Sequence, residues 1–135
     1  MGILTEDMKR LVSEQRLGFV ATVCPDGTPN LSPKGTTAIW DDDHIVFADI
    51  RSPATVSNLR RNPSTEINVV DPMVRKGYRF KGVASVVTEG AQFERILISI
   101  ERSEISTKAA PGLGHSYWSK STKLCHLFPP LTIKA

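Results

Sequence analysis

Apolar residues recur at helical spacing in three stretches of the chain. In each stretch, hydrophobic side chains three or four positions apart would share one face of a helix. The second stretch has clear ends, because Ser52 is a preferred N-cap and Pro53 suits the first helical position, whereas Asn62-Pro63 cannot continue a helix. The pattern predicts helices over about residues 3–16, 52–61 and 91–102.

Runs of β-branched and apolar residues predict six strands between and after these helices. Tight turns at Pro25-Asp26-Gly27 and Asp41-Asp42-Asp43 would join the first three strands into an antiparallel meander. Pro129-Pro130 interrupts the last strand and marks an edge or a bulge. Residues 109–121 are rich in Gly, Pro and Ser and are expected to form a loop. The predicted strands cover about residues 17–24, 30–40, 44–48, 65–70 and 78–88, and the last begins near Lys123.

The order of these elements predicts the fold class. Hairpin-linked strands with helices between and beside them favour a mainly β, α+β fold, in which the strands form a small closed or half-closed antiparallel barrel with flanking helices. With 135 residues, 40% of them hydrophobic and 23% charged, the chain has the composition of an ordinary globular protein. We expect a single domain over residues 1–135.

The net charge is small, with 17 basic against 14 acidic residues, a balance of +3. A nucleic-acid-binding protein usually carries a dense basic face, so we expect no nucleic-acid partner. The segment Arg75–Lys81 keeps that alternative open, because it places four cations and two aromatic residues within seven positions. The other interpretation of this segment is a solvated strand face.

The sequence predicts a cytoplasmic protein without a membrane partner. No stretch of 18 residues is apolar enough to span a bilayer, and the first residues are charged where a signal peptide would be apolar. Two cysteines, Cys24 and Cys125, lie far apart in the chain and are typical of reduced thiols rather than of a disulfide framework.

The polar residues form no recognisable metal site or catalytic set. His44, His115 and His126 lack the spacing of metal ligands, and no serine lies in a Gly-x-Ser-x-Gly motif. Cys24 has no adjacent base or helix start that would activate its thiol. We therefore predict no metal, and the catalytic residues remain unknown.

The start of the second predicted helix is the strongest local signal for a ligand. Its first backbone amides have no partner within the helix, and the helix dipole adds positive potential there, so the position favours an anion. Ser52 and Thr55 add hydroxyl groups at the same end, and Arg51 directly precedes them. The alternative is that Ser52 is an ordinary helix cap without a ligand.

Several motifs together resemble the pyridoxamine 5′-phosphate oxidase-like family of FMN-binding split-barrel proteins. The resemblance covers about residues 5–90, and its more specific part is the pair of a helix that ends in Asn58-Leu59-x-x-Asn62-Pro63 and a strand that ends in Lys81-Gly82-x-Ala84. The other matching segments are the Pro25–Pro29 hairpin, Asn30–Gly35, Ile45–Asp49 and Asn68–Asp71.

The resemblance implies a six-stranded antiparallel split β-barrel that forms a homodimer and holds one FMN per subunit in grooves at the interface. Residues near the flavin ring, the ribityl chain or its phosphate arm would be Lys34, Gly35, Thr36, Ala48 and Asp49. The phosphate cradle would contain Arg51, Ser52, Pro53, Ala54 and Thr55, with Asn58 one turn further on. From the partner chain, the strand with Tyr78, Arg79 and Lys81 would approach the ring.

The sequence departs from the oxidase proper within this cradle. Pro53-Ala54-Thr55 stands where the oxidase carries a Ser-Arg-Lys run, so the charge of a phosphate would be met by Lys34 and Arg51. The sequence therefore favours a flavin-dependent oxidoreductase that acts on an unidentified small-molecule substrate or electron donor, rather than genuine pyridoxamine 5′-phosphate oxidation. The alternatives are a non-catalytic flavin-binding module, or the same fold with a deazaflavin or haem.

Overall fold

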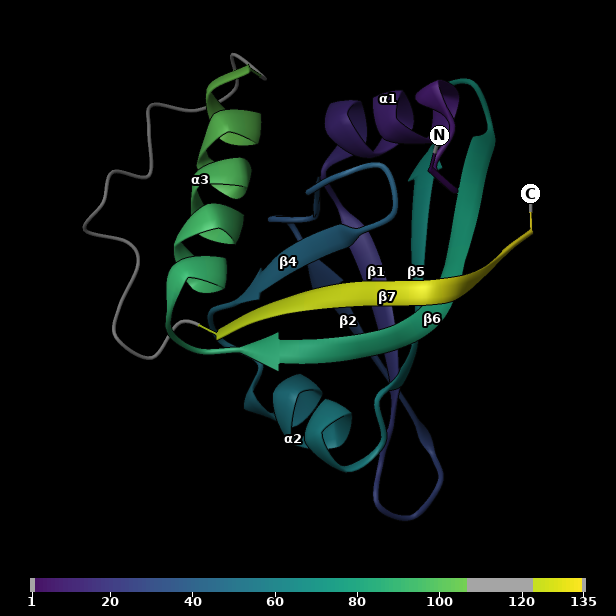
Figure 1. Ribbon diagram of the computed structural model, residues 1–135. Helices are drawn as coiled ribbons and strands as arrows, with labels where there is room; N and C mark the ends of the chain where they lie inside the picture. The colour runs from purple at the N-terminus through teal and green to yellow at the C-terminus, as the bar shows by residue number, and fades with distance from the viewer. Residues whose placement is uncertain (1, 107–122, 135) are drawn as a thin grey trace.

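The structure is a computed structural model that describes residues 2–106 and 123–134, with side chains described for residues 2–102 (Figure 1). The predicted loop over 109–121 lies outside the described residues. The three helices are α1 (Glu6–Gln15), α2 (Pro53–Arg61) and α3 (Ala91–Ser106). The strands are β1 (Gly18–Val23), β2 (Pro29–Lys34), β3 (Ala38–Ile39), β4 (Ile45–Asp49), β5 (Ser64–Asp71), β6 (Lys76–Val87) and β7 (Lys123–Lys134).

The strands form one sheet in the order β2-β1-β5-β6-β7-β4-β3, and every neighbouring pair is antiparallel. The predicted mainly β, α+β class is thus confirmed. In Figure 1 the strands β6 and β7 run across β1 and β2, so the sheet curls strongly around the interior of the molecule. The described part of the sheet has two edges, β2 and β3.

The prediction of one continuous strand over residues 30–40 was wrong. β2 ends at Lys34, and β3 is a two-residue strand at the opposite edge of the sheet, so the first three predicted strands do not form a simple meander. The physical reason lies in two threonines. Thr36 Oγ1 bonds to the backbone of Ala48, and Thr37 Oγ1 donates to the Lys34 carbonyl at 2.7 Å. Thr36 thus bonds to the end of β4 and Thr37 back to the end of β2, so the chain turns after Lys34 instead of continuing as one strand.

The local signals for the first hairpin and for a bulge in the last strand are confirmed. Gly27 has a φ of +84°, which suits the tight turn between β1 and β2. The register between β6 and β7 shifts between Lys81, which pairs with Thr132, and Val83, which pairs with Phe128. Pro129-Pro130 lies in that irregular stretch, as expected of proline within a sheet.

The hydrophobic core lies on both faces of β4, all five residues of which are buried. One face, with Ile45 and Phe47, packs in the main core together with apolar residues of α1, α2, β1, β5 and β6. The other face, with Val46 and Ala48, packs against Ile96 and neighbouring residues of α3. Because both faces of β4 are covered, residues 45–48 are all apolar and do not alternate with polar residues.

The face of β1, β2, β5 and β6 that points away from the main core carries exposed apolar side chains. Alternation along β6 buries Phe80 and Ala84 and leaves Val83 on the exposed side. The exposed side chains on this sheet face include Phe19, Leu31, Val70 and Val83, which we call the outer face. None of the helices in the described part of the chain is long and apolar enough to cross a membrane.

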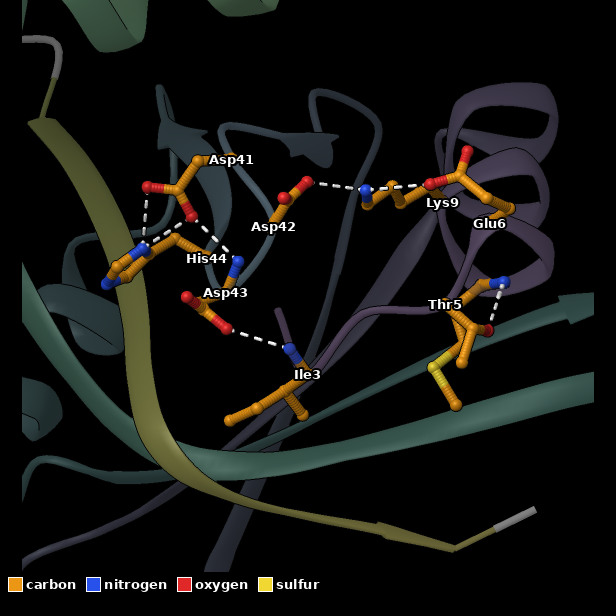
Figure 2. A network of polar contacts seen from close by, with 9 residues as sticks. Ile3, Thr5, Glu6, Lys9, Asp41, Asp42, Asp43 and His44 are labelled. Atoms are coloured by element: carbon orange, nitrogen blue, oxygen red, sulfur yellow. Dashed lines mark hydrogen bonds and ion pairs between the residues drawn. The ribbon is translucent and has the colours of Figure 1, made fainter. Parts of the chain in front are cut away.

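Two of the three consecutive aspartates after β3 anchor the N-terminal segment, and the third stabilises its own turn, as Figure 2 shows. Asp41 accepts from the backbone N–H of Asp43 and pairs with the His44 ring, whereas Asp42 pairs with Lys9 of α1. The carboxylate of Asp43 accepts from the backbone N–H of Ile3 at 2.8 Å. The aspartates thus bond to side chains and backbone of the chain itself.

Candidate functional site

A cavity of about 240 Å³ opens where the end of β2, the end of β4 and the start of α2 meet. Its walls come from two segments that are separate in the sequence, the end of β2 with the turn after it, and the stretch from the end of β4 to the start of α2. The lining residues are Pro33, Lys34, Gly35, Thr36, Ala48, Ile50, Arg51 and Ser52. Six of these were predicted site residues, and the fold brings them together around one space.

A buried ion pair forms part of the wall at the β2 side. Lys34 Nζ lies 2.8 Å from Asp49 Oδ1, and the two side chains are only 5% and 4% exposed. This pair joins the last residue of β2 to the last residue of β4. Because the carboxylate neutralises the ammonium, this side of the cavity carries no net charge.

Thr36 fixes the turn that follows β2. Its hydroxyl accepts from the backbone N–H of Ala48 at 2.9 Å and donates to the backbone carbonyl of the same residue at 3.1 Å. The turn therefore stays against the end of β4, although no strand ladder connects the two. The resulting wall presents the backbone around Gly35 to the cavity.

The residues at the start of α2 form the opposite side of the cavity, and one buried hydroxyl there has no protein partner. Ser52 occupies the N-cap position but makes no side-chain bond to a helix amide, and its hydroxyl lies 3.4 Å from that of Ser32. Thr55 is fully buried, and its Oγ1 has no hydrogen-bond partner in the described structure. Arg51 is exposed and forms no ion pair with the described residues. The interpretation of Ser52 as an ordinary side-chain cap therefore does not match the structure.

This arrangement suits an anion on chemical grounds. A helix of nine residues begins at Pro53, and the positive end of its dipole lies at this side of the cavity. An unpartnered buried hydroxyl such as that of Thr55 costs about 1–3 kcal/mol, and a ligand oxygen that accepted its proton would remove this cost. Pro53 and Ala54, also predicted in the cradle, are exposed at the first turn.

Asn58 holds α2 against β1. It is buried, and its Nδ2 donates to Thr22 Oγ1 at 3.1 Å and contacts Cys24 Sγ at 3.7 Å. Asn30 Nδ2 donates to the same hydroxyl at 3.3 Å. The side-chain amide predicted to face the phosphate is thus engaged with the sheet one turn below the cradle.

Three further predicted residues on β6 lie outside the lining of this cavity. The Tyr78 hydroxyl donates to Asp7 of α1, whereas Arg79 and Lys81 both pair with Glu66, at 3.2 and 3.5 Å. Lys81 and Glu66 line a second cavity of about 450 Å³, next to the hairpin between β1 and β2. The family resemblance implies that these β6 residues approach the cofactor of the partner subunit, and this stays a prediction.

A family model described as Pyridoxamine 5′-phosphate oxidase matches residues 4–124, nearly the whole chain. The chain belongs to the pyridoxamine 5′-phosphate oxidase family. The expected resemblance is therefore confirmed. No curated protein matches the chain.

Solved structures with the same fold include members with different names. HupZ of Group A Streptococcus is 30% identical and has a TM-score of 0.70, and the match covers 93% of this chain and 89% of that one. The heme storage protein HutZ of Vibrio cholerae is 19% identical with a TM-score of 0.74, over 100% and 95% of the two chains. An F420 reductase is 19% identical with a TM-score of 0.68, over 97% and 98%. The last two show the fold alone.

Two features of the site were not predicted from the sequence. The first is Ser32, whose hydroxyl reaches that of Ser52 at the start of α2. Its position two residues before Lys34 on β2 places both side chains on one strand face, and this spacing was an available signal. The pairing of Lys34 with Asp49 had no such signal, because each residue ends a different strand and only the fold brings the strand ends together.

Proposed function

We propose that the protein is an FMN-binding flavoprotein of the pyridoxamine 5′-phosphate oxidase family, and that it acts as an oxidoreductase on a small molecule. The observation that carries this proposal is the start of α2, where the unpartnered buried hydroxyl of Thr55, the hydroxyl of Ser52 and the cation of Arg51 lie at the positive end of the helix dipole. Such donors bind a phosphate monoester.

The flavin, when bound, supplies the hydride or electron chemistry, and the chain supplies binding and orientation. Arg51, Ser52 and Thr55 hold the phosphate, with Pro53 and Ala54 presenting the first turn of α2. The turn after β2 and the end of β4 extend the site away from the phosphate, along the ribityl chain and ring. The residues of that part are Lys34, Gly35, Thr36, Ala48 and Asp49.

The site is completed by a second copy of the chain in a homodimer of split barrels. A cavity of about 240 Å³ is smaller than the roughly 300–1,000 Å³ of typical ligand pockets, so one chain supplies only part of the walls. The outer face provides an apolar surface for the partner. In the dimer, the partner's β6 brings Tyr78, Arg79 and Lys81 toward the ring.

Haem and deazaflavin are the second candidates, because relatives of this fold are named a heme storage protein and an F420 reductase. Among the described residues, those that line the cavity offer hydroxyl, amide and cationic groups and include no His, Cys, Met or Tyr as an axial haem ligand. This composition favours a phosphate-bearing flavin or deazaflavin over haem. We place the protein in the cytoplasm and assign it neither nucleic acid nor membrane as a partner.

The absorbance spectrum of the freshly purified protein, before and after addition of FMN, tests the cofactor first. Titrations of flavin fluorescence then give the affinities for FMN and for riboflavin, which lacks the phosphate. We expect the parent to prefer FMN strongly, and the Ser52→Ala/Thr55→Val variant to lose about 10²–10³-fold in FMN affinity with little change for riboflavin. Ser57→Ala, an exposed hydroxyl on the same helix, is the matched control.

A parent protein without preference for FMN over riboflavin would contradict the phosphate cradle. A binding-only module is distinguished by the absence of turnover when the loaded protein receives NAD(P)H and an electron acceptor. A Soret band in place of flavin absorbance would make haem the cofactor.

A further inference from the structure

The two sides of the cavity differ in charge. At the α2 side, Arg51 has no acidic partner among the described residues, so this side is net positive. At the β2 side, the ammonium of Lys34 is matched by the buried carboxylate of Asp49. An elongated ligand with one anionic end therefore has a preferred direction in the cavity.

The pairing with Asp49 makes Lys34 a poor partner for a phosphate. A phosphate oxygen in hydrogen-bond contact with Lys34 Nζ would also lie within about 6 Å of the Asp49 carboxylate. Both side chains of the pair are almost completely buried, so water screens the resulting repulsion only weakly. The sequence alone suggested Lys34 as a phosphate ligand, and the buried carboxylate argues for a different role.

We propose that Asp49 is a positioning residue that holds the Lys34 ammonium toward an uncharged acceptor oxygen on the ring end of the cofactor. An ammonium has three N–H donors, and the bond to Asp49 Oδ1 is the one hydrogen bond that the Lys34 side chain makes with the described residues. Lys34 lines the cavity, so its other donors serve a ligand there. This role rests on the proposed flavin-binding function.

A purely structural role does not account for the pair equally well. Replacing a buried ion pair by apolar residues of similar size is often neutral or stabilising. The end of β4 is in addition already fixed to the turn after β2 by the two hydrogen bonds of Thr36. A neutral isosteric pair, Lys34→Met/Asp49→Leu, therefore removes the charges and leaves the fold intact.

The test compares the affinities of FMN and riboflavin in a double-mutant cycle. We expect Lys34→Met to weaken both flavins by the same factor, about tenfold or more, because the ring is common to both. Asp49→Ala should weaken both to a similar extent although Lys34 is still present. The double variant Lys34→Met/Asp49→Ala should bind no more weakly than either single variant, because the two residues act as one unit.

Lys34→Met/Asp49→Leu keeps the test informative if the single variants fold poorly. We expect this variant to melt at or above the temperature of the parent and to bind both flavins weakly. Parent-like binding of both flavins by this variant would overturn the proposed role, as would a Lys34→Met variant that lost affinity for FMN alone. If the parent protein still prefers FMN in either case, the proposed flavin-binding function stands and only the role of Asp49 is overturned. A parent protein that binds neither flavin overturns both the function and the role of Asp49.

Discussion

The Tyr78 hydroxyl on β6 donates a hydrogen bond to the Asp7 carboxylate on α1. Lys76 and Arg10 pair with the same carboxylate, so one acidic group joins the first helix to the hairpin between β5 and β6. The bonds from Lys76 and Tyr78 lower the pKa of Asp7 from its ordinary value of 3.8 to about 2. The carboxylate is thus stabilised in its charged form by the folded state.

The stability of the protein should therefore fall in acid through Asp7. Its pKa is lower in the folded than in the unfolded chain, so its contribution is fully present above about pH 4 and is lost as the pH falls toward 2. We expect Asp7→Asn to destabilise the protein at pH 6, with a difference from the parent that shrinks between pH 4 and 2. Denaturant melts at several pH values measure this.

Glu14→Gln is the control for this prediction, because Glu14 is exposed on the same helix. Its difference from the parent should be small at every pH. If the Asp7→Asn difference stayed constant from pH 6 to 2, the bonds to Lys76 and Tyr78 would not be the source of the acid sensitivity.

Replacing Asn58 should affect folding more than selectivity for the cofactor phosphate. Its Nδ2 bonds to the buried hydroxyl of Thr22, so Asn58→Ala leaves this group with one donor fewer, and we expect a loss of about 1–3 kcal/mol in the free energy of unfolding. The ratio of FMN to riboflavin affinity should remain that of the parent. A collapse of this ratio would place Asn58 at the phosphate, as the sequence first suggested.

Thr36→Val should open the wall between β2 and β4. It removes both hydrogen bonds to Ala48, and we expect a loss of about 1–3 kcal/mol in stability together with weaker binding of both flavins. Thr36→Ser keeps the hydroxyl and should restore most of both properties. Thermal melts and flavin titrations measure the two effects; equal behaviour of the valine and serine variants would show that the hydroxyl is unimportant.

The outer face should mediate dimer formation. We expect sedimentation at micromolar concentration to show a species of twice the 14.9 kDa of one chain, with an interface of roughly 1,600 Å² or more. Leu31→Asp, at a side chain that is 65% exposed on this face, should give monomers with weakened FMN binding. Ile98→Asp, at an exposed apolar residue of α3, should remain dimeric. A monomeric parent would contradict the proposed composite site.

Local patterns in the sequence predicted the elements well, for identifiable reasons. α2 begins and ends within a residue of its prediction, because Pro53 and Asn62-Pro63 restrict the backbone wherever the helix lies in the fold. α1 begins at Glu6 and not at residue 3, since Thr5 is its N-cap and accepts from the Met8 N–H. Such signals act within a few residues and need no knowledge of the fold.

What the sequence did not predict depends on contacts between distant segments. The break between β2 and β3 requires the backbone of Ala48 as a partner for Thr36, and the neutral side of the cavity requires Asp49 next to Lys34. Neither partner lies within the reach of a local pattern. The predicted site residues were therefore largely placed together, whereas the role of Lys34 changed once its partner was known.

The position of β4 in the sheet also determines when the site can form during synthesis. β4 is bordered on one side by only the two residues of β3, and on the other by β7, where Asp49 pairs with Lys123 and Ile45 with Leu127. A ribosome has to translate residues 123–134 before β4 gains its longer neighbour. Because such distant pairing forms late, we expect the wall of the cavity at the end of β4 to be completed only after β7 has been synthesised.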